Sequence, residues 1–337
     1  MTGSFRRIAT EEAYVIPEVL DPMRDRAARE EYDPDLLFWS RARAGSPLER
    51  RLLDMDSERL EIMDANGVDV QVISLASTGV QMFEPVKAAR LAALANDRLA
   101  EAMSRHPTRY YGLGCFAPQN PATAAREIRR AMEELRFSGM LVNSHTNGEY
   151  LDDEKYWPVL EVLEATGSPL YIHPRAPSPA MAQAYRKYTL EHAIWGFQAE
   201  TGLHAIRMIV GGVFDRFPGL KVILGHMGEG VPYWLTRIDA MYKAFQAEGR
   251  PSLQMAPSAY FLRNFVITTS GMNTPAAVKF CIETLGSERM MFAIDYPFCD
   301  TAEAVTAMDA MPISDTDKAN IYSKTAERIF SIPPGDN

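Results

Sequence analysis

The chain has 337 residues, of which 47% are hydrophobic and 23% charged, a composition that is ordinary for a folded globular protein with a large core. Its formal net charge of −9 argues against binding to nucleic acid, and it contains no apolar run of the ~18 residues that a membrane helix needs. The chain starts without the apolar stretch of a signal peptide, and its three cysteines form no CxxC pair, so we expect a reduced, cytoplasmic protein.

Eight short apolar runs alternate with amphipathic segments, and this alternation predicts strand–helix units around a parallel sheet. Helical periodicity is clearest over residues 88–107, 123–137 and 152–167. Eight units predict an α/β protein with a closed (β/α)8 TIM barrel, formed by a single domain over residues 1–337. An open doubly wound sheet is the alternative, but no GxGxxG motif follows the first strand. The predicted strands cover residues 7–11, 70–76, 110–116, 139–143, 169–173, 221–225, 265–269 and 290–294.

Two connections are longer than the geometry of a barrel requires. Residues 18–51 follow the first predicted strand, and residues 175–197 follow the fifth. In a barrel the loops after the strands lie on the face that carries the active site. We therefore expect both insertions to be lids over a site. Contacts between subunits are the alternative interpretation, and the two interpretations are compatible.

Metal-binding side chains stand at the ends of four of the predicted strands. Glu11 and Glu12 end the first strand, His173 ends the fifth, His226 follows the sixth and Asp295 follows the eighth. In a barrel these positions converge at one rim. Carboxylate and imidazole ligands together are typical of Zn, Mn or Fe sites, and a catalytic site leaves a coordination position open. Each residue alone could be a capping or core residue, but their grouping predicts a catalytic metal site.

The other histidines have less distinctive positions. His106 precedes Pro107 at the end of a predicted helix and is expected to cap it. His192 and His204 lie in helical pattern and are expected to be structural. His145 follows the fourth predicted strand, and it can be interpreted equally well as a site residue or as a loop residue.

These motifs resemble those of the amidohydrolase superfamily. Nearly the whole chain is similar to its branch of aminocarboxymuconate-semialdehyde decarboxylase-like enzymes, and within that branch it looks like the 5-carboxyvanillate and o-hydroxybenzoate decarboxylases. In the superfamily the motif at the end of the first strand usually reads HxH, and in the γ-resorcylate decarboxylases it usually reads EEH. This chain has Glu11, Glu12 and Ala13 there, so alanine stands where the last histidine would be. The resemblance therefore implies one divalent ion, Mn²⁺ or Zn²⁺, held by Glu11, His173 and Asp295. The similar segments include RIATEEAY, GVDVQVISLASTGVQ, LYIHP, FDRFPGLKVILGHMGEGVPYWLTRID and FAIDYPF.

The same resemblance implies a non-oxidative decarboxylase, a carbon–carbon lyase, acting on an ortho-hydroxylated benzoate such as 5-carboxyvanillate or a dihydroxybenzoate. The ion would act as Lewis acid and template, and Asp295 would protonate the ring carbon before CO2 leaves. His226 would orient or polarise groups near the metal. Glu229 would fix the tautomer of His226. An equally open interpretation of Glu229 is a carboxylate that is stabilised by the dipole of a helix at its N-terminus.

A small aromatic acid also needs a positive partner in a negatively charged protein. Arg50 and Arg237 match arginines that bind the substrate carboxylate in the carboxyvanillate enzymes, and the second reaches in from a neighbouring subunit. The resemblance thus implies a homodimer or homotetramer, while a surface salt bridge is the competing interpretation for Arg237. Ala76 and Phe298 are expected to line the pocket where those enzymes carry hydroxyl groups, which leaves the identity of the substrate open.

Two other functions compete with decarboxylation. The first is a hydrolase or hydratase on the same barrel, which would open a lactone or add water to an unsaturated dicarboxylate. The second is a binding protein that has lost its activity, and the intact set of metal-binding side chains argues against it.

Overall fold

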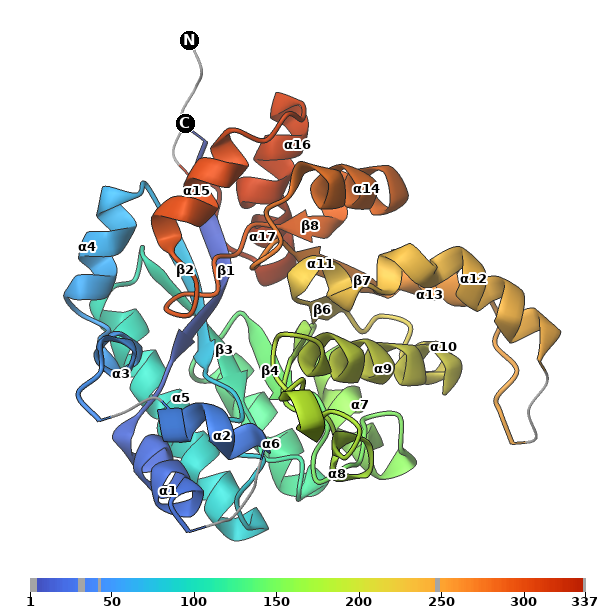
Figure 1. Ribbon diagram of the computed structural model, residues 1–337, viewed down its shortest axis with the longest axis horizontal. Coiled ribbons are helices and arrows are strands. Elements are labelled where there is room, and N and C mark those ends of the chain that lie inside the picture. The colour runs from blue at the N-terminus through green and yellow to red at the C-terminus, as the bar shows by residue number, and fades with distance from the viewer. Residues whose placement is uncertain (1–4, 30–33, 42–43, 246–248, 336–337) are drawn as a thin grey trace.

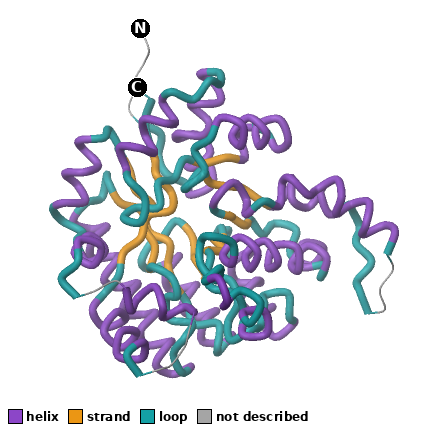
Figure 2. The backbone as a smooth tube through the Cα atoms, in the orientation of Figure 1, coloured by secondary structure: helices purple, strands orange, loops and turns teal. Residues whose placement is uncertain are grey.

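The structure is a computed structural model that describes residues 5–29, 34–41, 44–245 and 249–335. Eight parallel strands pair in sequence order from β1 to β8, and helices surround them (Figures 1 and 2). Sequential order is typical of a barrel, whereas a doubly wound sheet reverses its strand order. The predicted (β/α)8 barrel is confirmed. The strands are β1 Ile8–Tyr14, β2 Val70–Leu75, β3 Tyr110–Cys115, β4 Gly139–Asn143, β5 Leu170–His173, β6 Val222–Leu224, β7 Phe265–Thr268 and β8 Met290–Met291.

The helices begin at proline in many cases, because proline lacks the N–H that the first helical turn leaves unpaired. The predicted helices 88–107, 123–137 and 152–167 correspond to α5, α6 and the pair η1–α7. The helical elements are α1 Pro17–Ala27, α2 Pro34–Arg41, α3 Pro47–Leu53, α4 Glu58–Ala65, α5 Pro85–Arg105, α6 Pro121–Glu133, η1 Glu154–Tyr156, α7 Trp157–Ala165, α8 Pro179–Ala182, η2 Arg186–Tyr188, α9 Gly196–Val210, α10 Val213–Arg216, α11 His226–Glu229, α12 Val231–Ala244, α13 Pro257–Asn264, α14 Pro275–Leu285, η3 Ser287–Arg289, α15 Thr301–Asp309, α16 Asp315–Ala319, η4 Asn320–Lys324 and α17 Thr325–Phe330.

The seam between the last strand and the first lacks a regular ladder. β8 is shorter than the predicted strand 290–294, and the pairing of β1 with β2 shifts register between Ala9 and Glu12. Two backbone hydrogen bonds join the two sides, from Thr10 N to Phe292 O at 3.0 Å and from Ala13 N to Tyr296 O at 2.7 Å. β1 and the chain after β8 are therefore neighbours, and β1 continues three residues beyond Glu11.

A cluster of buried apolar side chains fills the inside of the barrel. Each strand contributes to it, and Phe330 of α17 and Ile332 after it pack against the same cluster. This packing closes the N-terminal end of the barrel, so polar side chains gather at the C-terminal end. The strand residues of the cluster are Ile8, Val70, Val72, Leu113, Leu141, Tyr171, Ile223, Val266 and Met291.

The two long connections contact each other beside this C-terminal end. The first contains α1, α2 and α3, and the second contains α8 and η2. The Arg175 guanidinium of the second connection forms an ion pair with Asp35 of α2 and also donates to the His145 carbonyl at 2.7 Å. A lid movement of these segments stays a prediction. Among the described residues, no helix combines the length and the apolar character needed to cross a membrane.

Candidate metal centre

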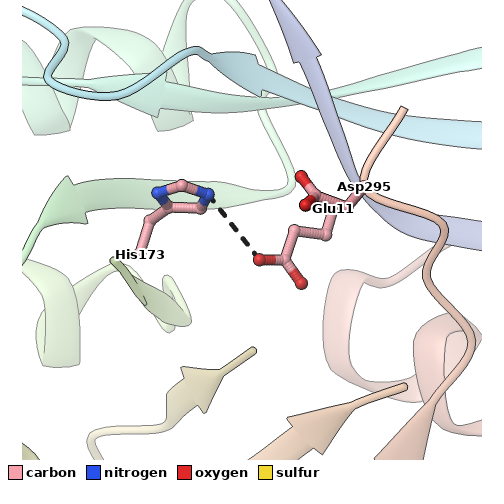
Figure 3. A group of neighbouring side chains, drawn as sticks. All are labelled: Glu11, His173 and Asp295. Atoms are coloured by element: carbon pink, nitrogen blue, oxygen red, sulfur yellow. Dashed lines mark ion pairs between the residues drawn. The ribbon is translucent and has the colours of Figure 1, made fainter. Parts of the chain in front are cut away.

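Glu11, His173 and Asp295 converge at the C-terminal end of the barrel. They come from β1, the end of β5 and the segment after β8, and one potential ligand atom of each lies within 4.8 Å of the others. The Nε2 atom of His173 is 3.7 Å from Oε1 of Glu11 (Figure 3). The structure thus brings together the three predicted ligands, each of which offers one ligand atom.

The hydrogen bonds of Glu11 show that this group fits a cation. Its Oε2 atom accepts from the Ser270 hydroxyl and, at 2.9 Å, from the Thr268 hydroxyl. Its Oε1 atom is buried and has no hydrogen-bond partner among the described residues. Buried acceptors are rarely left unpaired because their desolvation is then uncompensated. A divalent ion held by Glu11, His173 and Asp295 would satisfy this oxygen.

A chain of hydroxyl groups supports the paired oxygen of Glu11. The hydroxyl of Thr268 lies 3.0 Å from that of Ser270 and 3.3 Å from that of Tyr171. Ser270 also accepts the backbone N–H of His226 at 3.2 Å. Thr268 ends β7 and Ser270 follows two residues later, and both hydroxyl groups face Glu11. This arrangement orients the carboxylate and ties it to the turn that carries His226.

The GHMGEG motif forms a left-handed turn rather than a regular helix, although Figure 1 labels part of it α11. The backbone angle φ is positive at every residue from His226 to Gly230, with 47° at His226 and 54° at Glu229. Such angles cost non-glycine residues roughly 1–2 kcal/mol each. Strained backbone of this kind clusters at functional sites, where the surrounding structure holds it in place.

The turn places His226 between Glu229 on one side and Glu11 and Asp295 on the other. Its Nδ1 atom is 2.8 Å from Oε1 of Glu229, and its Nε2 atom is 3.9 Å from both Oε1 of Glu11 and Oδ2 of Asp295. Glu229 precedes α12 and contacts the imidazole, so the tautomer interpretation of Glu229 has a geometric basis. The alternative, a carboxylate at a helix N-terminus, also has a geometric basis, since α12 begins two residues after Glu229.

Burial and close charges shift the pKa values of this group in opposite directions. Burial would raise the pKa of Glu11, but the charges of His226 and His173 outweigh it and lower that pKa. Burial raises the pKa of Asp295, and the charge of Glu11 adds to the effect. Burial opposes the charged form of His226, yet the charges of Glu11 and Glu229 raise its pKa. Burial also raises the pKa of Glu12 to about 8.

Two cavities meet at His226 and Asp295. The smaller has a volume of about 180 Å³ and includes His173 in its wall, while the larger has a volume of about 780 Å³ and includes Arg237. Asp35 and Trp39 of the first connection and His192 of the second line the smaller cavity. The sequence pattern missed Asp35 and His192 as residues of this cavity. The helical position predicted for His192 is wrong, because α9 begins only at Gly196 and His192 lies in a loop beside the cavity.

The remaining predicted substrate residues are distributed unevenly. Phe298 lines the smaller cavity, and so do Ser77 and Thr78, which directly follow the buried Ala76. Arg50 is 62% exposed and pairs with Glu58 at 2.9 Å, so in this chain it forms a surface salt bridge outside both cavity walls. Their roles in binding substrate stay predictions.

Arg237 differs from Arg50 because it borders the larger cavity. Its side chain is exposed, and it forms no ion pair with any of the residues that the structure describes. The surface salt bridge that competes with the substrate interpretation is therefore not seen within the described chain.

The other histidines have structural contacts. His106 follows the last turn of α5 and its Nε2 lies 2.7 Å from Oδ1 of Asp56. In His145 one ring nitrogen contacts the Ala176 carbonyl at 3.1 Å and the other accepts from Gly148 N at 3.1 Å. Of the two interpretations left open for His145, this geometry favours the loop residue.

Comparison with known proteins agrees with this geometry. The profile of the amidohydrolase family matches residues 32–332. This chain belongs to the amidohydrolase family. The γ-resorcylate decarboxylase of a Polaromonas species is 36% identical over 293 residues, which cover 85% of this chain and 90% of that protein.

Two solved structures resemble this one over almost their whole length. The 5-carboxyvanillate decarboxylase of Sphingomonas paucimobilis superposes with a TM-score of 0.94 at 47% identity and covers 98% of this chain and 100% of its own. The 5-carboxyvanillate decarboxylase of Novosphingobium aromaticivorans, complexed with manganese and 4-hydroxy-3-methoxy-5-nitrobenzoic acid, has a TM-score of 0.94 at 38% identity, covering 98% and 97%. The relatives are thus decarboxylases of hydroxybenzoates, and one holds manganese.

Proposed function

We propose that this protein is a metal-dependent, non-oxidative decarboxylase of an ortho-hydroxylated benzoate. Glu11, His173 and Asp295 would hold one divalent ion, Mn²⁺ or Zn²⁺. The observation that carries the proposal is the unpartnered Oε1 atom of Glu11, buried where the other two side chains converge. The relatives support the choice of reaction, because they are decarboxylases of hydroxylated aromatic acids.

When bound, the ion would supply Lewis acidity and positive charge beside the phenol and carboxylate oxygens of the substrate. Loss of CO2 directly from the ring would leave an unstable aryl anion, so the ring carbon is protonated first. Asp295 lies in the walls of both cavities and acts as the proton carrier. It takes the phenolic proton and delivers it to the carbon that bears the carboxylate. The carbon–carbon bond then breaks, its electron pair restores the aromatic ring, and CO2 and a phenolate leave.

His226 and Glu229 support this proton transfer. The imidazole donates from Nδ1 to Glu229, which directs Nε2 toward Asp295 and Glu11. His226 thereby orients the carboxyl group that moves the proton. Phe298 presents an apolar wall to the ring of the substrate, which favours a ring substituent without a hydroxyl at that position.

Arg237 supplies positive charge for the substrate carboxylate. It lies on α12, which projects from the barrel (Figure 1) and exposes Tyr233 and Trp234. Exposed aromatic residues on a projecting helix favour contact with a second subunit. We therefore propose a homodimer or homotetramer in which Arg237 reaches the site of a neighbouring subunit.

The experiment that tests the function combines metal analysis with a panel of substrates. The purified protein is expected to contain about one Mn²⁺ or Zn²⁺ per chain and to release CO2 from 5-carboxyvanillate, 2,6-dihydroxybenzoate or 2-hydroxybenzoate. A chelator should abolish the activity, and added Mn²⁺ should restore it. Bound metal with hydrolysis of lactones and no release of CO2 would instead favour the hydrolase. A single domain over residues 1–337 and a cytoplasmic location stay predictions.

A further inference from the structure

The residue next to the first ligand contacts the last one through the backbone. Glu12 is completely buried, and its two carboxylate oxygens accept the N–H groups of Ile294 and Tyr296, each at 3.1 Å. These two residues flank Asp295 on either side. The side chain of Glu12 therefore holds both peptide groups that border the proposed proton carrier.

Asp295 needs this support because its backbone has an unfavourable conformation. Its φ angle is 71°, in the left-handed region that a non-glycine residue rarely adopts unless its neighbours enforce it. Its carbonyl oxygen accepts from Phe298 N at 2.8 Å and from Cys299 N at 3.0 Å, which fixes the C-terminal side of the turn. Glu12 adds two further bonds, because it accepts the N–H groups of the residues before and after Asp295.

Because the barrel seam is irregular, the N–H groups of Ile294 and Tyr296 are not used in a strand ladder and can bind a side chain instead. β8 ends at Met291, so Ile294 and Tyr296 lie beyond its regular ladder. A buried guanidinium lies at the same corner, where Arg59 donates to Ala13 O at 2.6 Å and lies over the ring of Tyr296 at 4.7 Å from its centroid. The corner thus contains a buried carboxyl group, a buried guanidinium and the backbone on both sides of Asp295.

We propose that Glu12 is a positioning residue that sets the place of Asp295 relative to Glu11 and His173. Neighbouring residues of β1 then act on the same carboxyl group by different routes. Glu11 shares the metal with it, and Glu12 holds its backbone. The inference rests on the metal centre of the proposed function.

The test compares two buried glutamates that bind backbone N–H groups. Glu12→Gln keeps one acceptor and places an amide N–H₂ against the other N–H, and Glu12→Ala removes both acceptors. Glu200 is the matched control, since it is also completely buried and accepts from Ser178 N at 3.1 Å. Binding of Mn²⁺ is measured by the electron paramagnetic resonance signal of the free ion, together with the melting temperature of each variant.

We expect Glu12→Gln to weaken the affinity for Mn²⁺ roughly 10–100-fold, as the loss of groups that orient metal ligands commonly does. Glu12→Ala should weaken it at least as much, whereas Glu200→Gln should lower the melting temperature and leave the affinity unchanged. Wild-type affinity in both Glu12 variants, or an equal loss in Glu200→Gln, would overturn the proposal. If Glu12→Ala does not fold, Glu12→Asp is measured in its place and should weaken the affinity because its acceptors lie one methylene too far away.

The affinity measurement separates this inference from the proposed function. If the wild-type chain binds Mn²⁺ but decarboxylates no hydroxybenzoate, the proposed reaction is wrong, and the affinities of the Glu12 variants still decide the positioning role. If the wild-type chain binds neither Mn²⁺ nor Zn²⁺, both proposals are wrong.

Discussion

Two clusters of buried and half-buried side chains contain the same kinds of group and differ in how their hydrogen bonds are satisfied. The metal cluster consists of Glu11, His173, His226, Ser270 and Asp295. The β4–β5 cluster consists of Ser144, Glu200 and His204, near the loops that follow these two strands.

In the β4–β5 cluster both carboxylate oxygens of Glu200 and the Nε2 atom of His204 accept a hydrogen bond. His204 has Ser144 Oγ 3.3 Å from Nδ1 and accepts Leu151 N at 3.1 Å on Nε2. Glu200 has the Ser144 hydroxyl on one oxygen and Ser178 N on the other. In the metal cluster Oε1 of Glu11 has no partner among the described residues, and His226 and Asp295 of the cluster line two cavities. Residue types alone therefore do not identify a site, whereas an unpaired buried carboxylate oxygen among potential metal ligands that border a cavity points to one.

The largest expected effect is at the centre of the metal cluster. Asp295→Asn removes the carboxyl group that carries the proton, and we expect kcat for decarboxylation to fall about 10²–10⁴-fold. Steady-state rates and the metal content of the purified variant are the measurements. Near wild-type turnover with the metal still bound would remove Asp295 from the role of proton carrier.

Removing a hydroxyl group distinguishes the two clusters more directly. Ser270→Ala takes a donor from Glu11 and an acceptor from the N–H of His226, so the affinity for Mn²⁺ should fall roughly 10-fold or more. Ser144→Ala is the matched change in the β4–β5 cluster and should leave the affinity unchanged. Equal affinities in the two variants would contradict the distinction.

The β4–β5 cluster should affect stability rather than metal binding. His204→Leu leaves the N–H of Leu151 without its acceptor, and we expect the free energy of unfolding to fall by about 1–3 kcal/mol. Chemical denaturation measures this change, and metal analysis below the transition should give the wild-type content. A folded variant that has lost its metal would show that the two clusters are coupled.

Acid should destabilise the β4–β5 cluster through His204. Burial lowers the pKa of this imidazole from 6.5 to about 3, so between these values the unfolded chain binds more protons than the folded chain. Stability is full above the unfolded pKa and is lost as the pH falls into this window. From about pH 7 to about pH 5 the expected loss is about 2 kcal/mol for one such histidine. A slope of stability against pH that is the same in His204→Gln would contradict this assignment.

The sequence predicted the barrel and the convergence of polar strand-end residues because both depend on local pattern, whereas the choice of Glu11, His173 and Asp295 among them came from the family resemblance. Apolar runs at regular intervals set the strands, and polar residues at their ends meet at one rim in any barrel. The left-handed turn at His226 could not be predicted, since positive φ angles there depend on tertiary contacts such as that between His226 N and Ser270. The place of His192 beside the cavity was missed for a similar reason, because helical composition does not reveal where α9 begins.

The irregular seam between β8 and β1 has a consequence for how the chain acquires its metal. Glu12 and Ile294 are separated by 282 positions in sequence, and their hydrogen bond crosses the seam. Contacts of such long range require closure of a very large loop and form late in folding. During synthesis, the first proposed ligand leaves the ribosome long before the last. A nascent chain that stops before Asp295 should therefore fail to retain the ion, so metal retention reports that the barrel has closed.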